Sequence, residues 1–184
     1  MVALNTPVCE FDKKAPDFKL PDCFGNTHTL KDCLGPNGLL VMFICNHCPF
    51  VKAILPDLIK TTEELRASGI NTVAIMSNDF VEYPDDSPEN MKALVEEKNF
   101  GFPYLVDETQ TVAKEFGAVC TPDFFGYNSD LGLQYRGRFD GRGRNIDSSA
   151  EKNELLEAML KVAKTGKGPK EQIPSIGCSI KWKE

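Results

Sequence analysis

The chain has 184 residues, a length typical of one domain that buries a substantial core. Its net charge of −6 argues against nucleic acid or an anionic membrane as the main partner. The first residues do not form a signal peptide, and no apolar run approaches the roughly 18 residues that span a bilayer. These features predict a cytoplasmic protein without a membrane segment.

The first half of the chain predicts two short extended segments followed by a strand–helix–strand unit. The stretch DFKLPDCFGNTHTL (17–30) indicates two extended pieces around a turn at Gly25. Apolar runs rich in Val and Ile at 38–44 and 70–76 are typical of strands that are buried on both faces. Between them, apolar residues recur with helical spacing from Phe50 to Leu65.

The second half predicts three helices and a hairpin. Helices are expected over 87–98, with Ser87 as its cap, over about 109–116, and over about 148–165. The stretch 123–138 predicts two strands that are joined by a turn.

This order of elements predicts an α/β protein with a mixed central sheet and helices on both faces. The order is that of a thioredoxin-like fold. We expect a single thioredoxin-like domain over 1–184, with 1–37 as an N-terminal extension and 166–184 as a C-terminal tail.

The stretch FICNHCPFVKAILP (43–56) contains the candidate reactive residues. In a C-x-x-C redox pair, Cys45 would lead and Cys48 would resolve, whereas a second interpretation puts Cys48 in the lead. Cys48 and Pro49 fall at the predicted start of a helix, where free amides and the helix dipole stabilise a thiolate. Such a position lowers a thiol pKa from about 8.5 to roughly 3.5–7.5. His47 would add positive charge when protonated.

The segment VMFICNHCPFVKAILPDL resembles the active-site segment of thioredoxin-like proteins. The resemblance puts Cys48 at the nucleophilic cysteine, Phe43 at the strand phenylalanine, and Lys52 and Pro56 at the helix lysine and mid-helix proline. Val51 then occupies the place of the usual resolving cysteine. The resemblance therefore implies that Cys48 is the nucleophile.

The stretch GAVCTPDFF (117–125) resembles the loop in which a cis-proline faces the reactive cysteine of this fold. By this resemblance Pro122 is the cis-proline and Thr121 presents its backbone to a bound substrate. Cys120 would then lie near Cys48.

Segments along almost the whole chain, including APDFKLPD, SNDFVEYPDDSPENM, YRGRFDGR and GCSIKW, resemble a peroxiredoxin-like branch of the thioredoxin superfamily. This branch belongs with the alkyl hydroperoxide reductase and thiol-specific antioxidant proteins. True peroxiredoxins have proline and threonine where Val41 and Cys45 stand here, and the arginine expected near the cis-proline is missing. A peroxide pocket of the usual kind is therefore not expected.

These observations predict a thiol-dependent oxidoreductase of cell redox homeostasis that acts on disulfides or peroxides through Cys48. His47 would modulate the thiolate, and Cys45 or Cys120 would resolve the intermediate, with Cys45 slightly favoured. Cys178, in the tail, could return to the active site and stays a third candidate. A protein disulfide or small peroxide is the expected substrate and an external thiol the expected reductant, with no cofactor.

Two alternatives stay open: a thiol peroxidase with an unorthodox pocket, and a non-catalytic redox-sensing or binding module. A zinc site built from Cys45, His47 and Cys48 with Cys33 or Cys120 is disfavoured, because structural zinc sites usually combine two ligand pairs. We therefore expect no metal. The acidic stretch DFVEYPDDSP is expected to be a solvated loop near the rim of the active site, and the arginines of YRGRFDGRGRN to be solvated, with ion pairs to Asp140 and Asp147.

Overall fold

The structure is a computed structural model that describes residues 2–148 and 152–184. The strands are β1 (Ala3–Asn5), β2 (Lys19–Pro21), β3 (Thr27–Thr29), β4 (Gly38–Phe43), β5 (Ile70–Met76), β6 (Tyr104–Val106), β7 (Cys120–Thr121), β8 (Asp123–Asn128), β9 (Leu133–Tyr135) and β10 (Ile176–Ser179). The helices are α1 (Leu30–Cys33), α2 (Pro49–Ala67), the 3₁₀ turn η1 (Pro84–Asp86), α3 (Pro88–Lys98), α4 (Thr111–Phe116) and α5 (Glu154–Thr165).

The elements predicted from the sequence are present, with two kinds of difference. The helix expected from about Ser148 begins at Glu154, where the Asn153 side chain accepts a hydrogen bond from the Leu156 amide; part of the predicted stretch, 149–151, lies outside the described residues. The short strands β1, β6, β7 and β10, the one-turn helix α1 and the 3₁₀ turn η1 were not predicted. Strands of two to four residues carry too little alternation to be recognised by pattern.

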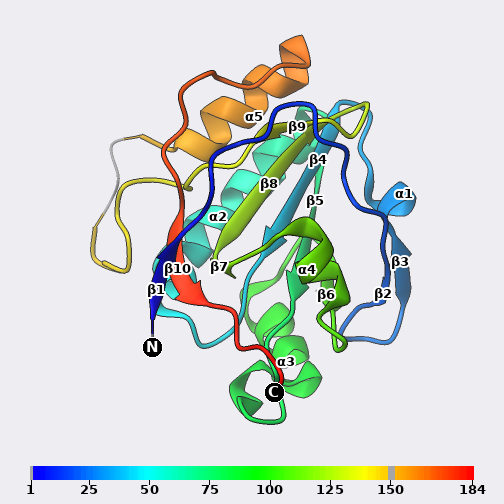
Figure 1. Ribbon diagram of the computed structural model, residues 1–184, viewed down its shortest axis with the longest axis vertical. Helices are drawn as coiled ribbons and strands as arrows, with labels where there is room; N and C mark the ends of the chain where they lie inside the picture. The colour runs from blue at the N-terminus through cyan, green and yellow to red at the C-terminus, as the bar shows by residue number, and fades with distance from the viewer. Residues whose placement is uncertain (1, 149–151) are drawn as a thin grey trace.

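The central layer consists of β6, β5, β4, β8 and β9 (Figure 1). β4 pairs antiparallel with β8, β8 with β9, and β5 parallel with β6. β4 lies beside β5, where the Ile44 amide donates to the Ile75 carbonyl at 3.1 Å. The mixed sheet expected from the order of elements is confirmed.

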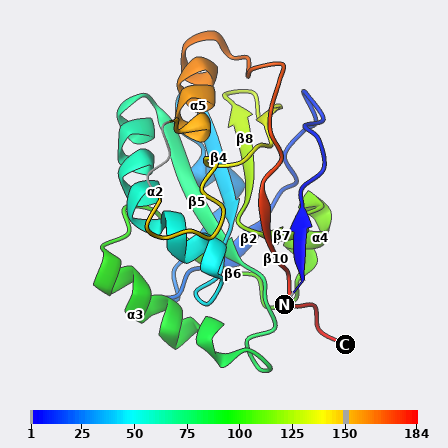
Figure 2. The ribbon, with the colours of Figure 1, turned by 90° about the vertical axis from the view of Figure 1, so that its left-hand side faces the viewer.

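The side chains of β4 alternate between two hydrophobic clusters, one on each face of the sheet. Leu40 and Met42 face the cluster that is formed with α2 and α5, whereas Val41 and Phe43 face the cluster that is formed with α1 and α4. Figures 1 and 2 show the corresponding arrangement, with α2 and α5 over one face and α4 over the other. Helices on both faces are thereby confirmed.

The two ends of the chain meet in a small separate sheet of order β1–β10–β7. β10 lies in the middle, with Cys178 paired to Ala3 on one side and to Thr121 on the other. The tail predicted for 166–184 thus returns over the surface to the loop that precedes β8 (Figure 2). Within the described residues, no helix combines the length and the apolar character that a membrane crossing needs.

A buried ion pair fixes the start of β8. Arg136 donates from Nη2 to an Asp123 carboxylate oxygen at 3.1 Å and to the Gly117 carbonyl at 2.8 Å. Asp123 is fully buried, and Arg136 is 8% exposed and lies over the Phe125 ring. The expectation of solvated arginines is wrong here, because Arg136 holds a carboxylate that no water reaches.

The other arginines of this stretch also bind carboxylates. Arg142, with a side chain that is 8% exposed, pairs with Asp140 and Asp57, and Arg138 pairs with Glu154. The predicted partner Asp140 is confirmed. None of the ion pairs between described residues includes Asp147.

Replacing Arg136 tests this buried pair. Arg136→Leu leaves the Asp123 carboxylate buried without its cation, so the free energy of unfolding, measured with urea, should fall by about 3–5 kcal/mol. Arg144→Leu, at an exposed position, should change it by less than about 0.5 kcal/mol. Adding Asp123→Asn to Arg136→Leu should recover part of the loss. A loss below about 1 kcal/mol for Arg136→Leu would contradict the stabilising role of the pair.

Candidate active site

Cys48 lies in the turn between strand β4 and helix α2, which is the longest of the described helices. It is the N-cap residue of α2, with extended backbone, and Pro49 follows as the first helical residue. The amides of Val51 and Lys52 bond to the Cys48 carbonyl at 3.1 and 2.9 Å, which starts the helix directly beneath the thiol. The predicted position of Cys48 at a helix N-terminus is confirmed.

Three cysteines form what we call the thiol cluster: Cys45, Cys48 and Cys178. The Cys48 Sγ lies 3.0 Å from the Cys178 Sγ and 3.1 Å from the Thr121 carbonyl oxygen. Cys45 hydrogen bonds to Cys48, and its Sγ lies 3.3 Å from the Thr121 hydroxyl. All three cysteines are at most 3% exposed, so the cluster is a dry site.

Hydrogen bonding determines which of the three thiols carries the negative charge. The side chain of Cys45, and then the side chain and backbone of Cys178, donate to Cys48 and lower its pKa to about 5, against the opposing effect of burial. The pKa of Cys45 is raised by its bond to Cys48 and by burial. Burial and the Cys48 charge raise the pKa of Cys178 to about 12. Of the three thiols, Cys48 thus has the lowest pKa and is the one that these contacts favour as a thiolate.

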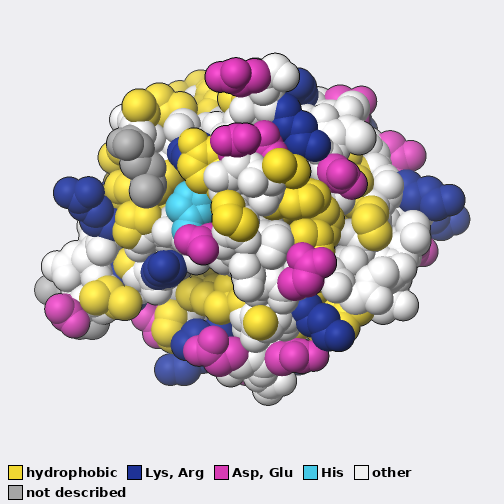
Figure 3. All heavy atoms as spheres, turned by 90° about the horizontal axis from the view of Figure 1, so that it is seen from below, with side chains coloured by type: hydrophobic (Ala, Val, Ile, Leu, Met, Phe, Trp, Pro, Cys, Tyr) yellow, Lys and Arg dark blue, Asp and Glu magenta, His cyan; other side chains and the backbone are white. Residues whose placement is uncertain are grey.

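His47 is held by an aspartate that the sequence did not single out. Its Nδ1 lies 2.6 Å from an Asp86 carboxylate oxygen, and its ring stacks on Tyr83 with 5.8 Å between ring centroids. The hydrogen bond to Asp86 raises the pKa of His47, which favours the imidazolium near the thiolate. Figure 3 views this end of the molecule, where a histidine side chain reaches the surface among hydrophobic and acidic side chains.

The acidic stretch is not uniformly solvated as expected, because Asp86 is fully buried. Its carboxylate accepts from the Asn46 amide at 2.7 Å and from the Asn78 side chain at 2.8 Å, besides bonding to His47. These bonds shape the C-N-H-C turn. Burial alone would raise the pKa of Asp86, but the hydrogen bonds outweigh it and the pKa is lowered. The neighbouring Asp85 is exposed as predicted.

The loop before β8 closes the other side of the cluster. The Thr121–Pro122 peptide bond is cis, as the resemblance implied. Thr121 directs its carbonyl and hydroxyl oxygens at Cys48 and Cys45, while its backbone pairs with Cys178 of β10. The edge at which a substrate was expected to dock is therefore occupied by the tail of the same chain.

Cys120 lies beside the cluster and makes different contacts. It is fully buried, its thiol faces the Pro122 carbonyl at 3.6 Å, and burial raises its pKa strongly. Cys178, by contrast, is in direct contact with Cys48 although 130 positions separate them in sequence. Its only sequence signal was a cysteine at the start of an apolar alternation in the tail.

The groups that could bind a metal ion in the described residues are Cys45, His47 and Asp86, whose ligand atoms lie within 4.8 Å of one another. Each already has a partner: Cys45 bonds to Thr121, and His47 and Asp86 bond to each other. Cys33 packs in the hydrophobic cluster on the opposite face of the sheet, so it cannot complete the zinc set that was weighed from the sequence.

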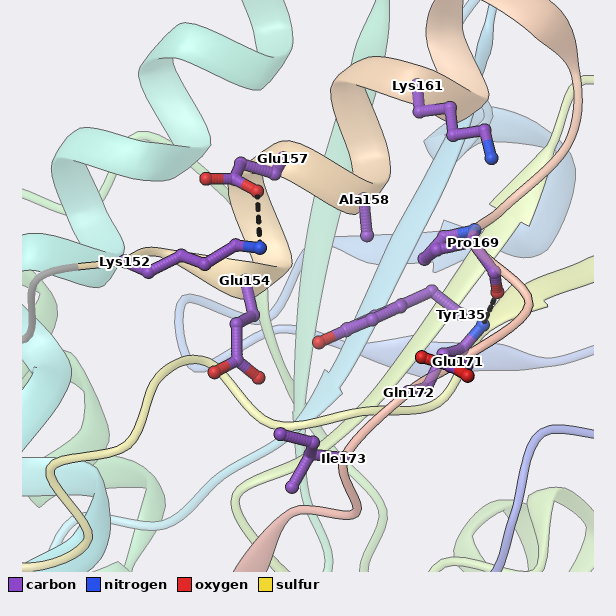
Figure 4. A pocket seen from close by; sticks show the side chains of 10 residues that line it. All are labelled: Tyr135, Lys152, Glu154, Glu157, Ala158, Lys161, Pro169, Glu171, Gln172 and Ile173. Atoms are coloured by element: carbon purple, nitrogen blue, oxygen red, sulfur yellow. Dashed lines mark hydrogen bonds and ion pairs between the residues drawn. The ribbon is translucent and has the colours of Figure 1, made fainter.

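One cavity lies away from the thiols. It measures about 490 Å³ and opens between α5 and the tail, where Tyr135, Ala158 and Ile173 meet charged residues such as Lys152 and Glu157 (Figure 4). No cysteine lines it. A smaller hollow beside the thiol cluster has a volume of about 20 Å³ and is lined by residues that include Phe50, Pro122 and Ile176.

Comparison with solved structures supports a thioredoxin-like protein. An uncharacterised conserved protein of Geobacillus kaustophilus is 43% identical, with a TM-score of 0.93 over 100% of this chain and 97% of that one. A peroxidoxin of Mycobacterium tuberculosis has 17% identity and a TM-score of 0.62 over 84% and 96% of the two chains. The thioredoxin domain of a Bacteroides vulgatus thiol-disulfide oxidoreductase has 20% identity and a TM-score of 0.58 over 74% and 91%.

The fold is thus that of the thioredoxin-like proteins, and within them its peroxiredoxin-like branch. The model of the AhpC/TSA family matches residues 11–139, which is more than half of the chain, and the chain belongs to that family. Family membership supports a thioredoxin-like redox function. A search of curated proteins found no significant match to this chain.

The His47–Asp86 pair gives a test by titration. Asp86→Asn should bring the pKa of His47 down toward or below its ordinary value of about 6.5, measured from ring proton shifts in NMR. Asp85→Asn, one residue away and exposed, should leave the pKa unchanged. An unchanged His47 titration in Asp86→Asn would contradict the pairing.

The sign of the stability effect follows from the two shifts. The pKa of His47 is higher in the folded protein than in the unfolded chain. The stability that this adds is fully present below the unfolded pKa and is lost as the pH rises through the folded pKa. The lowered pKa of Asp86 contributes stability that is lost as the pH falls through its folded value, below 3.8. Asp86→Asn should therefore cost most between these limits, near pH 5–6, and less at pH 9.

Proposed function

We propose that the protein is a thiol-disulfide oxidoreductase whose nucleophile is Cys48, acting in redox homeostasis. The observation that carries the proposal is the buried thiol cluster, in which the Cys48 and Cys178 sulfurs lie 3.0 Å apart and hydrogen bonding to Cys45 and Cys178 lowers the pKa of Cys48. A thiolate attacks a disulfide sulfur and expels the partner thiol, and a lowered pKa keeps Cys48 in that form at neutral pH.

The partners follow from this chemistry. A small or protein disulfide is the oxidant, and an external thiol returns the enzyme to its reduced state. The reducing cytoplasm is the expected compartment, because thiols persist there. His47 acts on the reaction through its charge, because Asp86 favours its protonated form.

A thiol peroxidase is the second candidate, and the burial of Cys48 favours it. Cys48 is 0% exposed, so a small oxidant reaches it more easily than a protein disulfide does. The AhpC/TSA family and the peroxidoxin among the structural neighbours point in the same direction. Against it, Arg136, the arginine nearest to the cis-proline loop in sequence, is engaged by Asp123.

Alkylation by iodoacetamide tests the nucleophile. Among the thiols, Cys48 should react fastest at pH 7, and its rate should fall with an apparent pKa well below 9, near 5, as the pH is lowered. Cys120, whose pKa is raised by burial, is the internal control and should react slowest. The measurement is site-resolved mass spectrometry after timed quenching; Cys45 or Cys120 reacting tenfold faster than Cys48 would refute the assignment.

Rates with a small disulfide and with hydrogen peroxide distinguish the thiol-disulfide oxidoreductase from the thiol peroxidase. Stopped-flow rates of oxidation should be higher with a small disulfide than with hydrogen peroxide, because Val41 and Cys45 replace the proline and threonine of a peroxide pocket. Cys48→Ser is the control and should abolish both reactions. Faster peroxide consumption at Cys48 would favour the peroxidase.

A further inference from the structure

The tail strand β10 lies where an extended substrate would bind. Thr121, whose backbone was expected to face a substrate, pairs antiparallel with Cys178, and Ser179 pairs with Cys120. In this register Cys178 occupies the position opposite Cys48 at which a residue of an extended substrate would lie. An extended peptide that pairs with an open strand edge makes the same kind of contact.

The cysteine in that strand is within bonding reach of the nucleophile. Its Sγ lies 3.0 Å from the Cys48 Sγ, and the Cys178 side chain and backbone both hydrogen bond to Cys48. A small movement brings two sulfurs at that separation to the roughly 2.05 Å of a disulfide. Cys178 is thus aligned with the reacting sulfur before any oxidation.

The close approach of β10 depends on a glycine. A Cβ at Gly177 would lie 2.1 Å from the Thr121 carbonyl oxygen and 3.0 Å from the Pro122 nitrogen. Both are backbone atoms that cannot rotate away, so any other residue at this position pushes the strand off the loop. The sequence GCS of the tail is therefore suited to this edge.

We propose that β10 is an internal substrate strand, in which Cys178 resolves the intermediate on Cys48 while the strand excludes extended peptides from the docking edge. The proposal rests on the proposed nucleophile and adds a resolving residue and a substrate class. Small disulfides such as glutathione disulfide are the expected oxidants, and longer cysteine peptides react only when β10 leaves.

The reaction balances in two exchanges. The Cys48 thiolate attacks one sulfur of the small disulfide, forms a mixed disulfide and expels the first thiolate. The Cys178 sulfur, losing its proton, attacks the Cys48 Sγ, forms the Cys48–Cys178 disulfide and expels the second thiolate. The Cys48 thiolate and the Cys178 thiol are oxidised to one disulfide, and the small disulfide is reduced to two thiols. One of the leaving thiolates takes the proton of Cys178 and the other takes a proton from water.

Of the two candidate resolving thiols, Cys45 and Cys178, the nearby charged groups favour deprotonation of Cys178. Cys45 faces the buried Asp86 carboxylate, which opposes its deprotonation. Cys178 has the Lys181 ammonium nearby, which favours it. Once Cys48 has become a neutral mixed disulfide, its own charge no longer holds the proton on either neighbour, and the difference between Asp86 and Lys181 remains.

Glutathione disulfide with the reduced full-length protein tests the resolving role. The wild type should form a Cys48–Cys178 disulfide and retain no glutathione, whereas Cys178→Ser should keep glutathione on Cys48. Cys120→Ser is the matched control and should still form the Cys48–Cys178 bond. Mass-spectrometric disulfide mapping is the measurement, and the wild-type map alone decides the pairing if a variant does not fold.

Two different failures are distinguishable in that experiment. A Cys45–Cys48 or Cys48–Cys120 disulfide in the wild type, persisting in Cys178→Ser, overturns the role of Cys178 and leaves Cys48 as nucleophile. Cys48→Ser exchanging with glutathione disulfide as fast as the wild type overturns the proposed function itself.

Gly177→Ala tests the covering strand without changing a thiol. The added methyl should push β10 off Thr121, slow formation of the Cys48–Cys178 bond by tenfold or more, and speed the reaction of Cys48 with a disulfide-linked peptide. Gly101→Ala is the control, because its Cβ would meet only the Arg66 side chain, at 3.5 Å. Equal peptide rates in Gly177→Ala and the wild type would refute the exclusion of peptides by β10.

Discussion

The site is organised around one negative charge that is withdrawn from water. A thiolate at Cys48 is fully buried, and a buried charge is costly unless donors surround it. Two neighbours supply the hydrogen bonds that water does not: the thiol of Cys45, and the thiol and amide of Cys178. Cys45 belongs to the turn and Cys178 to the tail strand, so segments far apart in the sequence both contribute to lowering the pKa of Cys48.

Much of the fold was predictable because its signals are local. The strands at 38–44 and 70–76 and the helices that follow show their periods within single stretches, and the ends of α3 and α4 carry a serine cap and a closing glycine. The position of Cys48 at a helix start followed from the end of the preceding strand, the helical spacing that begins at Phe50, and Pro49 as a residue suited to the first turn. The short strands gave no such signal, since their partners lie far along the chain.

Only those parts of the site that lie within one short stretch of sequence, or that a resemblance identified, were predictable. Cys45, His47 and Cys48 belong to one stretch, and Pro122 was found by resemblance, but the partners that set their chemistry are distant. Asp86 looked like one more acid in a polar loop, and only the fold shows that its carboxylate binds the turn. Cys178 meets Cys48 across 130 positions, and no spacing rule connects them.

The separation of the hydrophobic core into two clusters has a consequence for spectroscopy. Cys45, Cys48 and Cys178 belong to the cluster beneath α2 and α5, whereas Phe18, Phe43, Phe116 and Phe125 pack together on the opposite face of the sheet. The sheet insulates one set from the other. The proposed chemistry at Cys48 thus lies wholly on the side of α2 and α5, and the ring resonances of the four phenylalanines on the other side would provide an internal standard for changes near the thiol cluster.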